Sequence, residues 1–238
     1  MIRPMTRRLV VFDVDGTLVD SQRLILASMA MAFDAAGLPP PDAAETLSII
    51  GLSLPEAMRA LRPMLDDDAI AALVAGYKAS FNQLRHGQGA APLYPGALAV
   101  VTNLVTLPGV VLGIATGKSR RGLDALLQAH DLERFFTTSQ VADDHPSKPH
   151  PSMLLRAQAE TGTGPGVMVG DTEFDMAMGR CGLCHHWGDM GLSWPRTAAS
   201  GRSGDRRVWP VATGVAAALG GIDGGLGGQA VLDRCQRG

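Results

Sequence analysis

Short apolar runs and stripes of helical period alternate along most of the chain. Leu9 to Phe12 is a continuous β-prone run, the pattern of a strand covered on both faces in a parallel sheet. From residue 94 onward the pattern predicts helices over 95–105, 119–130 and 149–160, strands over 110–115, 136–139 and 167–169, and a helix opening after Asp171. Strands that alternate with helices imply βαβ units, so we expect an α/β fold with a Rossmann-like parallel sheet.

The stretch 20–90 breaks this alternation, because it shows helical patterns and no convincing strand. We expect a helix over 21–36 that ends at Gly37, a short helix that opens at Pro55, and a longer helix that follows the acidic run 66–68. The sequence therefore predicts an α/β core of residues 1–19 and 91–179, with a small helical cap inserted at 20–90.

Two carboxylates follow the first strand. Asp13 and Asp15 lie two residues apart in an extended segment, so both side chains aim at one spot. Gly16 permits a sharp turn directly after them. Two adjacent carboxylates repel unless a cation or a proton lies between them, and a solvated acidic turn is the alternative.

Two further groups follow later strands. Thr116 ends the second strand, and Gly117 with the helix start behind it presents N–H groups to an anion. A helix cap explains Thr116 equally well on its own. A phosphate-binding Walker loop does not fit, because Gly113 and Gly117 have one residue too few between them. Lys148 stands between prolines before a helix and is a positioned point charge, although a surface lysine is the default interpretation.

Asp171 and Asp175 follow the third long strand. Asp171 lies where the strand gives way to a helix, and Asp175 lies about one helical turn further on. Paired carboxylates of this kind suit magnesium, although Asp171 also suits a helix cap. The acid pairs, the hydroxyl and the lysine fall at carboxyl ends of strands, where open α/β sheets bind ligands.

Composition narrows the possible partners. The formal net charge is −2 and the basic residues form no stripe, so we expect no nucleic-acid partner. No apolar run is long enough to span a bilayer, and the apolar run after the N-terminal arginines is too short for a signal peptide. We expect a cytoplasmic protein, monomeric or homodimeric.

The ordered segments around Asp13, Thr116, Lys148 and Asp171 resemble the four motifs of the haloacid dehalogenase superfamily, over residues 9 to about 178. The helical insert is similar to the small mobile cap of that family. The resemblance implies Asp13 as nucleophile and Asp15 as general acid and base. It also implies substrate binding by five residues: Gly16, Thr17, Thr116, Gly117 and Lys148. Mg²⁺ would be bound by the acids Asp13, Asp15, Asp171 and Asp175.

The resemblance also bears on the reaction. Dehalogenating members carry tyrosine at the place of Asp15, so this chain resembles a phosphatase that works through an aspartyl phosphate. Gly51-Leu52-Ser53 in the insert is similar to phosphoglycolate phosphatases and their near relatives. Phosphoglycolate, a small phosphorylated metabolite, is therefore the expected substrate. The alternative is that the chain is a sugar-phosphate phosphatase or mutase of the same superfamily.

The tail over 180–238 departs from the family pattern. All Cys and Trp residues lie there, and the β-branched strand that the family has after residue 178 is missing. Cys181 to His185 spells a haem-attachment pattern, and the cysteines and histidines could suggest zinc, but the crowding and the lack of an export signal disfavour both. If the codons for Cys184 to Pro195 are read one base later, they permit a run rich in β-branched residues that ends in Trp.

We therefore predict a frameshift near Arg180, which would leave the sheet without the strand beside the one that carries Asp171. Two hypotheses follow for function: an active phosphatase, because every motif residue precedes the break, or a catalytically impaired relative.

Overall fold

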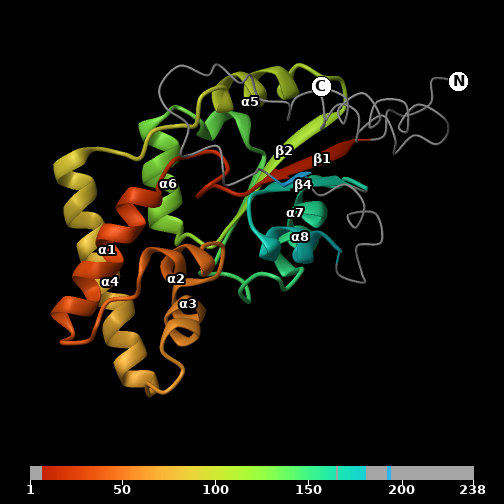
Figure 1. Cartoon of the computed structure of the whole chain (residues 1–238). Coiled ribbons are helices and arrows are strands. Elements are labelled where there is room, and N and C mark those ends of the chain that lie inside the picture. Colours follow the sequence, from red (N-terminus) through yellow and green to blue (C-terminus); the bar gives the residue numbers. More distant parts are fainter. Residues whose placement is uncertain (1–6, 165, 181–191, 194–238) are drawn as a thin grey trace, which may run out of the picture.

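Five parallel strands form one sheet in the order β3-β2-β1-β4-β5 in the computed structural model, which describes residues 7–164, 166–180 and 192–193 (Figure 1). The strands are β1 (Arg8–Phe12), β2 (Val110–Thr116), β3 (Thr138–Val141), β4 (Gly166–Gly170) and β5 (Leu192–Ser193). The predicted parallel α/β sheet is confirmed. The expected strand at 136–139 begins later, at Thr138, because Glu133–Phe135 forms a short 3₁₀ helix, η1.

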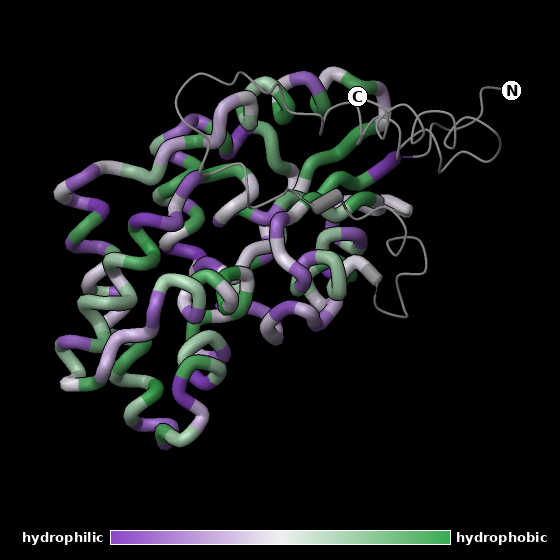
Figure 2. Tube along the Cα trace, in the orientation of Figure 1, coloured by the Kyte–Doolittle hydropathy of each residue, from purple (hydrophilic) through white to green (hydrophobic). Residues whose placement is uncertain are grey.

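Helices cover both faces of the sheet. The helices α5 (Ala97–Val105) and α6 (Arg120–Ala129) cover one face, and α7 (Ser152–Thr161) and α8 (Glu173–Arg180) cover the other. Alternation along β1 divides its side chains, since Val10 and Phe12 pack toward α5 whereas Leu9 and Val11 pack toward α7. All four are fully buried, and β1 and β2 are largely hydrophobic along the trace (Figure 2).

The segment expected to form a cap folds into four helices beside the sheet (Figure 1). They are α1 (Gln22–Ala35), α2 (Ala43–Ser48), α3 (Leu54–Leu61) and α4 (Asp67–Gln88). They share a separate hydrophobic core of seven buried residues: Met29, Phe33, Ile49, Ala57, Met58, Ile70 and Leu73. The helix α2 was not predicted from the sequence.

Two adjacent chain segments join the cap to the core. The backbone N–H of Asp20 donates to Pro92 O at 2.9 Å, and Tyr94 N–H donates to Leu18 O at 3.0 Å. Val19 and Leu93 form a bridge between them. The cap is thus attached through one paired junction.

The tail contributes β5 to the described structure. Leu192 and Ser193 pair with Val169 and Gly170 of β4. The expectation that no strand lies beside β4 is therefore wrong at these two residues. The rest of the frameshift hypothesis, with the Cys, His and Trp residues of the tail, lies outside the described residues. In the described part of the chain, no helix is both long and apolar enough to cross a membrane.

Candidate active site

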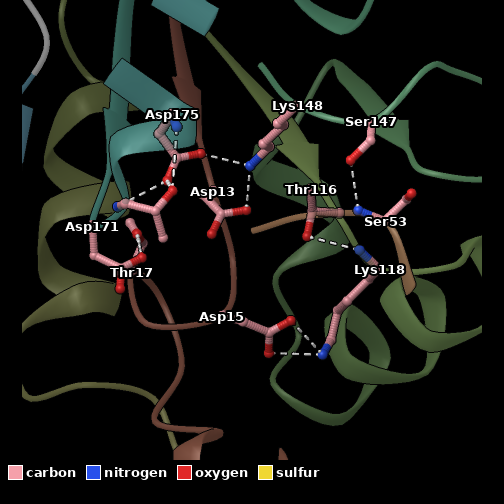
Figure 3. Close-up of polar contacts among 11 residues, drawn as sticks. Asp13, Asp15, Thr17, Ser53, Thr116, Lys118, Ser147, Lys148, Asp171 and Asp175 are labelled. Carbon is pink, nitrogen blue, oxygen red and sulfur yellow. Dashed lines mark hydrogen bonds and ion pairs between the residues drawn. The ribbon is translucent and has the colours of Figure 1, made fainter. Parts of the chain in front are cut away.

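Four loops at the carboxyl edge of the sheet bring the predicted site residues together (Figure 3). Asp13 follows β1, Thr116 ends β2, Lys148 lies in the loop between β3 and α7, and Asp171 follows β4. The side chains of Asp13, Thr116 and Lys148 are almost completely buried. Because parallel strands end at the same edge, residues far apart in sequence meet at one point.

Lys148 is the centre of the polar contacts. Its Nζ lies 2.8 Å from Asp13 Oδ1 and 2.6 Å from Asp175 Oδ1. Its side chain is 0% exposed, so the default interpretation as a surface lysine does not fit. Burial alone would lower the pKa of Lys148, but the carboxylates of Asp13 and Asp175 outweigh burial and raise it. Lys148 is therefore a fixed cation inside the site.

Asp175 is held by the start of α8. Thr172 N–H and Oγ1 donate to Asp175 Oδ2 at 3.1 and 2.6 Å, and Asp175 N–H donates to Thr172 Oγ1 at 3.2 Å. This reciprocal pair is a capping box. The cap residue of α8 is thus Thr172, in contrast to the alternative that placed Asp171 in that role. Asp171 Oδ1 instead accepts a hydrogen bond from Thr17 Oγ1 at 3.2 Å.

Asp13, Asp171 and Asp175 form a group that could hold a metal ion. One oxygen from each of the three lies within 4.8 Å of the others. Asp13 Oδ2 is buried and, among the described residues, has no hydrogen-bond partner. A buried acceptor without a partner is costly, and Lys148 supplies only one positive charge against three carboxylates. A divalent cation with oxygen ligands, such as Mg²⁺, would satisfy both the charge and the unpaired oxygen.

The ionisation of Asp13 reflects the same excess of negative charge. Burial raises the pKa of Asp13 to about 8, the Lys148 ammonium opposes the rise, and the carboxylates of Asp175 and Asp171 add to it. A cation bound beside Asp13 would oppose this rise and favour the ionised carboxylate.

Asp15 lies apart from that group, on the cap side of the site (Figure 3). Lys118 Nζ donates to both oxygens of Asp15 at 2.8 Å, and Ser21 Oγ donates to Asp15 Oδ1 at 2.5 Å. The carboxylate of Asp15 is bound to these other side chains, and the metal role expected for Asp15 stays a prediction. The sequence reasoning missed Lys118, although it directly follows Thr116-Gly117.

Two glycines let the loops approach one another. Gly16 has φ +86°, and a Cβ there would lie 2.3 Å from Asp171 Oδ2. A Cβ on Gly117 would lie 2.5 Å from the backbone oxygen of Leu52 in the cap. Any larger residue at either position would separate the loops that form the site.

The cap closes over this edge of the sheet. Ser53 N–H donates to Ser147 Oγ at 2.8 Å, which joins the start of α3 to the loop that carries Lys148 (Figure 3). Between cap and core lies a cavity of about 680 Å³. Its walls include Asp13, Asp15 and Thr116 from the core and residues of α1, α3 and α4 from the cap. A small molecule in this cavity would contact both parts.

Comparisons with known proteins agree with this architecture. The model of the haloacid dehalogenase-like hydrolases matches residues 10–182. The chain therefore belongs to the haloacid dehalogenase-like hydrolase family. The family supports phosphatase chemistry on small phosphorylated substrates.

Individual relatives carry several names. The probable phosphatase IndB of Dickeya dadantii is 35% identical over 179 residues, which cover 72% of this chain and 76% of IndB. The pyrophosphatase PpaX of Bacillus pumilus is 34% identical over 176 residues, with 72% and 77% covered. A solved structure of a predicted phosphoglycolate phosphatase from Haemophilus somnus has a TM-score of 0.64 at 22% identity, with 74% and 82% covered. This last likeness shows the fold alone.

Proposed function

We propose that the protein is a Mg²⁺-dependent phosphatase that hydrolyses a small phosphate monoester through an aspartyl phosphate on Asp13. The observation that carries the proposal is that Asp13 Oδ2 is buried and has no hydrogen-bond partner within the described part of the chain, in a site that holds one lysine and two further carboxylates. A nucleophile must have a free oxygen, and the other oxygen of Asp13 is fixed by Lys148.

In the first step, an Asp13 oxygen attacks phosphorus and the bond from phosphorus to the alcohol oxygen breaks. Asp15 gives its proton to that oxygen, so the alcohol leaves neutral. Lys148, Thr116 and the backbone around Gly16, Thr17 and Gly117 bind the phosphoryl oxygens as their charge develops. A bound Mg²⁺ would be held by Asp13, Asp171 and Asp175 and would offset negative charge on the phosphoryl group.

In the second step, Asp15 takes a proton from water, and the water oxygen attacks phosphorus. The bond from phosphorus to Asp13 breaks, which releases inorganic phosphate and restores both carboxyl groups. Lys118 holds Asp15 at the boundary between core and cap, where the alcohol would leave.

The ester itself is open to direct test. Phosphoglycolate is the candidate from the sequence resemblance, and sugar phosphates are the alternative. The pyrophosphatase name of PpaX adds pyrophosphate to the panel. Release of inorganic phosphate from these compounds with Mg²⁺ present would support the proposal, provided that Asp13→Asn removes the activity. Absence of any Mg²⁺-dependent release, with properly folded protein, would favour the impaired relative.

A further inference from the structure

Much of the cap wall of the cavity is apolar, and Lys78, Asn82 and Arg85 of α4 also line it. Six cap residues on this wall have apolar or aromatic side chains: Ile25, Met29, Ile50, Leu54, Tyr77 and Phe81. The polar groups of the site, Asp13, Asp15 and Thr116, line the same cavity from the core. The cavity thus has a polar end for a phosphoryl group and an apolar surface facing the position of the alcohol.

Tyr77 and Phe81 form an aromatic patch on this wall. They lie four residues apart on α4 and therefore on one face of the helix. Their ring centroids are 5.9 Å apart and their planes are inclined by 31°. Both residues are partly exposed and line the cavity.

Lys118 connects this patch to the reacting position. Its Nζ lies 2.8 Å from Asp15 Oδ1 and 5.1 Å from the centroid of the Phe81 ring. One ammonium group thus contacts both the proposed proton donor and the aromatic patch. Because Asp15 protonates the leaving oxygen, a group attached to that oxygen would lie within reach of Phe81.

The size of the cavity favours a bulky alcohol. About 680 Å³ lies in the range of pockets that bind molecules much larger than a two-carbon acid. Cationic side chains also line the cavity: Lys78 and Arg121 are exposed to solvent, Lys118 is paired with Asp15, and Arg85 is half-buried. Aromatic side chains bury a large apolar area, and another ring packs against them in an offset-stacked or edge-to-face arrangement.

We propose that the substrate is a phosphate monoester of an alcohol that carries a flat, unsaturated ring, and that Tyr77 and Phe81 form the subsite for the ring. The inference rests on the proposed function, because Asp15 defines where the alcohol leaves. It narrows the substrate class, and phosphoglycolate is then a poor substrate.

Benzyl phosphate and ethyl phosphate test the proposal, because their alcohols have similar acidity and differ in the ring. We expect kcat/KM of the Mg²⁺-loaded protein to be at least about tenfold higher for benzyl phosphate. Equal values, a preference for ethyl phosphate, or faster turnover of phosphoglycolate than of benzyl phosphate would overturn the ring subsite and leave the phosphatase proposal intact.

Substitutions in the patch test whether it causes the preference for benzyl phosphate over ethyl phosphate. Phe81→Ala should reduce the ratio of the two kcat/KM values several-fold, and Phe81→Leu, which keeps an apolar side chain without the ring, should give an intermediate ratio. Met64→Ala is the matched control, since Met64 is a cap residue that is 94% exposed and does not line the cavity. A ratio that Phe81→Ala leaves unchanged would contradict the assignment.

Binding of inert analogues separates the two proposals. Benzylphosphonate should bind the Mg²⁺-loaded wild-type protein at least about tenfold more tightly than ethylphosphonate. If that preference holds while neither ester is hydrolysed, the ring subsite stands and the phosphatase proposal fails. If the two phosphonates bind equally, the ring subsite is wrong whatever the turnover.

Discussion

Lys118 Nζ lies 2.8 Å from both carboxylate oxygens of Asp15, in a contact where each side chain is largely shielded from solvent. A partly buried lysine with two short hydrogen bonds to one carboxylate fixes the orientation of that carboxylate. The proposed acid and base is therefore positioned by a residue that directly follows Thr116 and Gly117, the pair proposed to bind the phosphoryl group.

Lys118→Met should reduce kcat by about tenfold to a hundredfold, because Asp15 would lose its fixed orientation while every other proposed reacting group stays in place. The proper comparison is Arg134→Ala, which removes the exposed ion pair with Asp131 and should have little effect. Steady-state kinetics on one ester would measure both. Full activity in Lys118→Met would show that Asp15 does not depend on Lys118.

Asp13→Asn should abolish turnover while the fold is kept, since the amide has nearly the shape of the carboxylate but is not a nucleophile. We expect a loss on the order of a thousandfold or more. Circular dichroism would check the fold, and phosphate release the activity. Activity within about tenfold of the parent would exclude Asp13 as the nucleophile.

Lys148→Ala should reduce turnover strongly, because the alanine variant would leave the carboxylates of Asp13 and Asp175 buried without their shared cation. Lys148→Arg should restore only part of the rate, since a planar guanidinium cannot reproduce the contacts of an ammonium group. Kinetics and thermal denaturation of both variants give the measurement. Wild-type kinetics in the alanine variant would remove Lys148 from the mechanism.

Magnesium binding should strengthen as pH rises toward about 8, because a proton on Asp13, whose pKa is raised to that value mainly by burial, competes with the ion. In the metal-free protein, the free energy of unfolding should change with pH in the opposite direction. Folded Asp13 keeps its proton above the ordinary pKa of 3.8, so stability should fall as pH rises from there to about 8.

Titration calorimetry at several pH values, with thermal denaturation after EDTA treatment, tests both trends. EDTA should also remove activity, and added Mg²⁺ should restore it. Normal turnover by the chelated protein would refute the metal role, and a pH-independent affinity for Mg²⁺ would refute the coupling to Asp13.

Much of the fold followed from the sequence because its patterns are local. The apolar run before Asp13 and the alternation after residue 94 predict β1 and the βαβ units. The helix α2 was missed because it is short, although Asp42 and Glu45 form a capping box that is visible in the sequence as an acid pair three residues apart.

The convergence of Asp13, Thr116, Lys148 and Asp171 was also expected, since each follows a strand of one sheet. The pairing of Lys118 with Asp15 was not, because it joins residues 103 positions apart and depends on how closely two loops approach. The burial of Lys148 likewise depends on tertiary packing, which no local pattern encodes. The aromatic patch of Tyr77 and Phe81 lines the cavity only because α4 lies over the site, and that position is also set by tertiary packing.

The central claim is that Asp13 is phosphorylated during turnover, and trapping the intermediate tests it most directly. The protein would be quenched in acid during hydrolysis of an active ester with Mg²⁺, and its peptides would be analysed by mass spectrometry. We expect one phosphoryl group on Asp13 in the wild-type protein and none at this position in the Asp13→Asn variant. Sustained turnover with Asp13 unmodified, or a phosphoryl group on another residue, would contradict it.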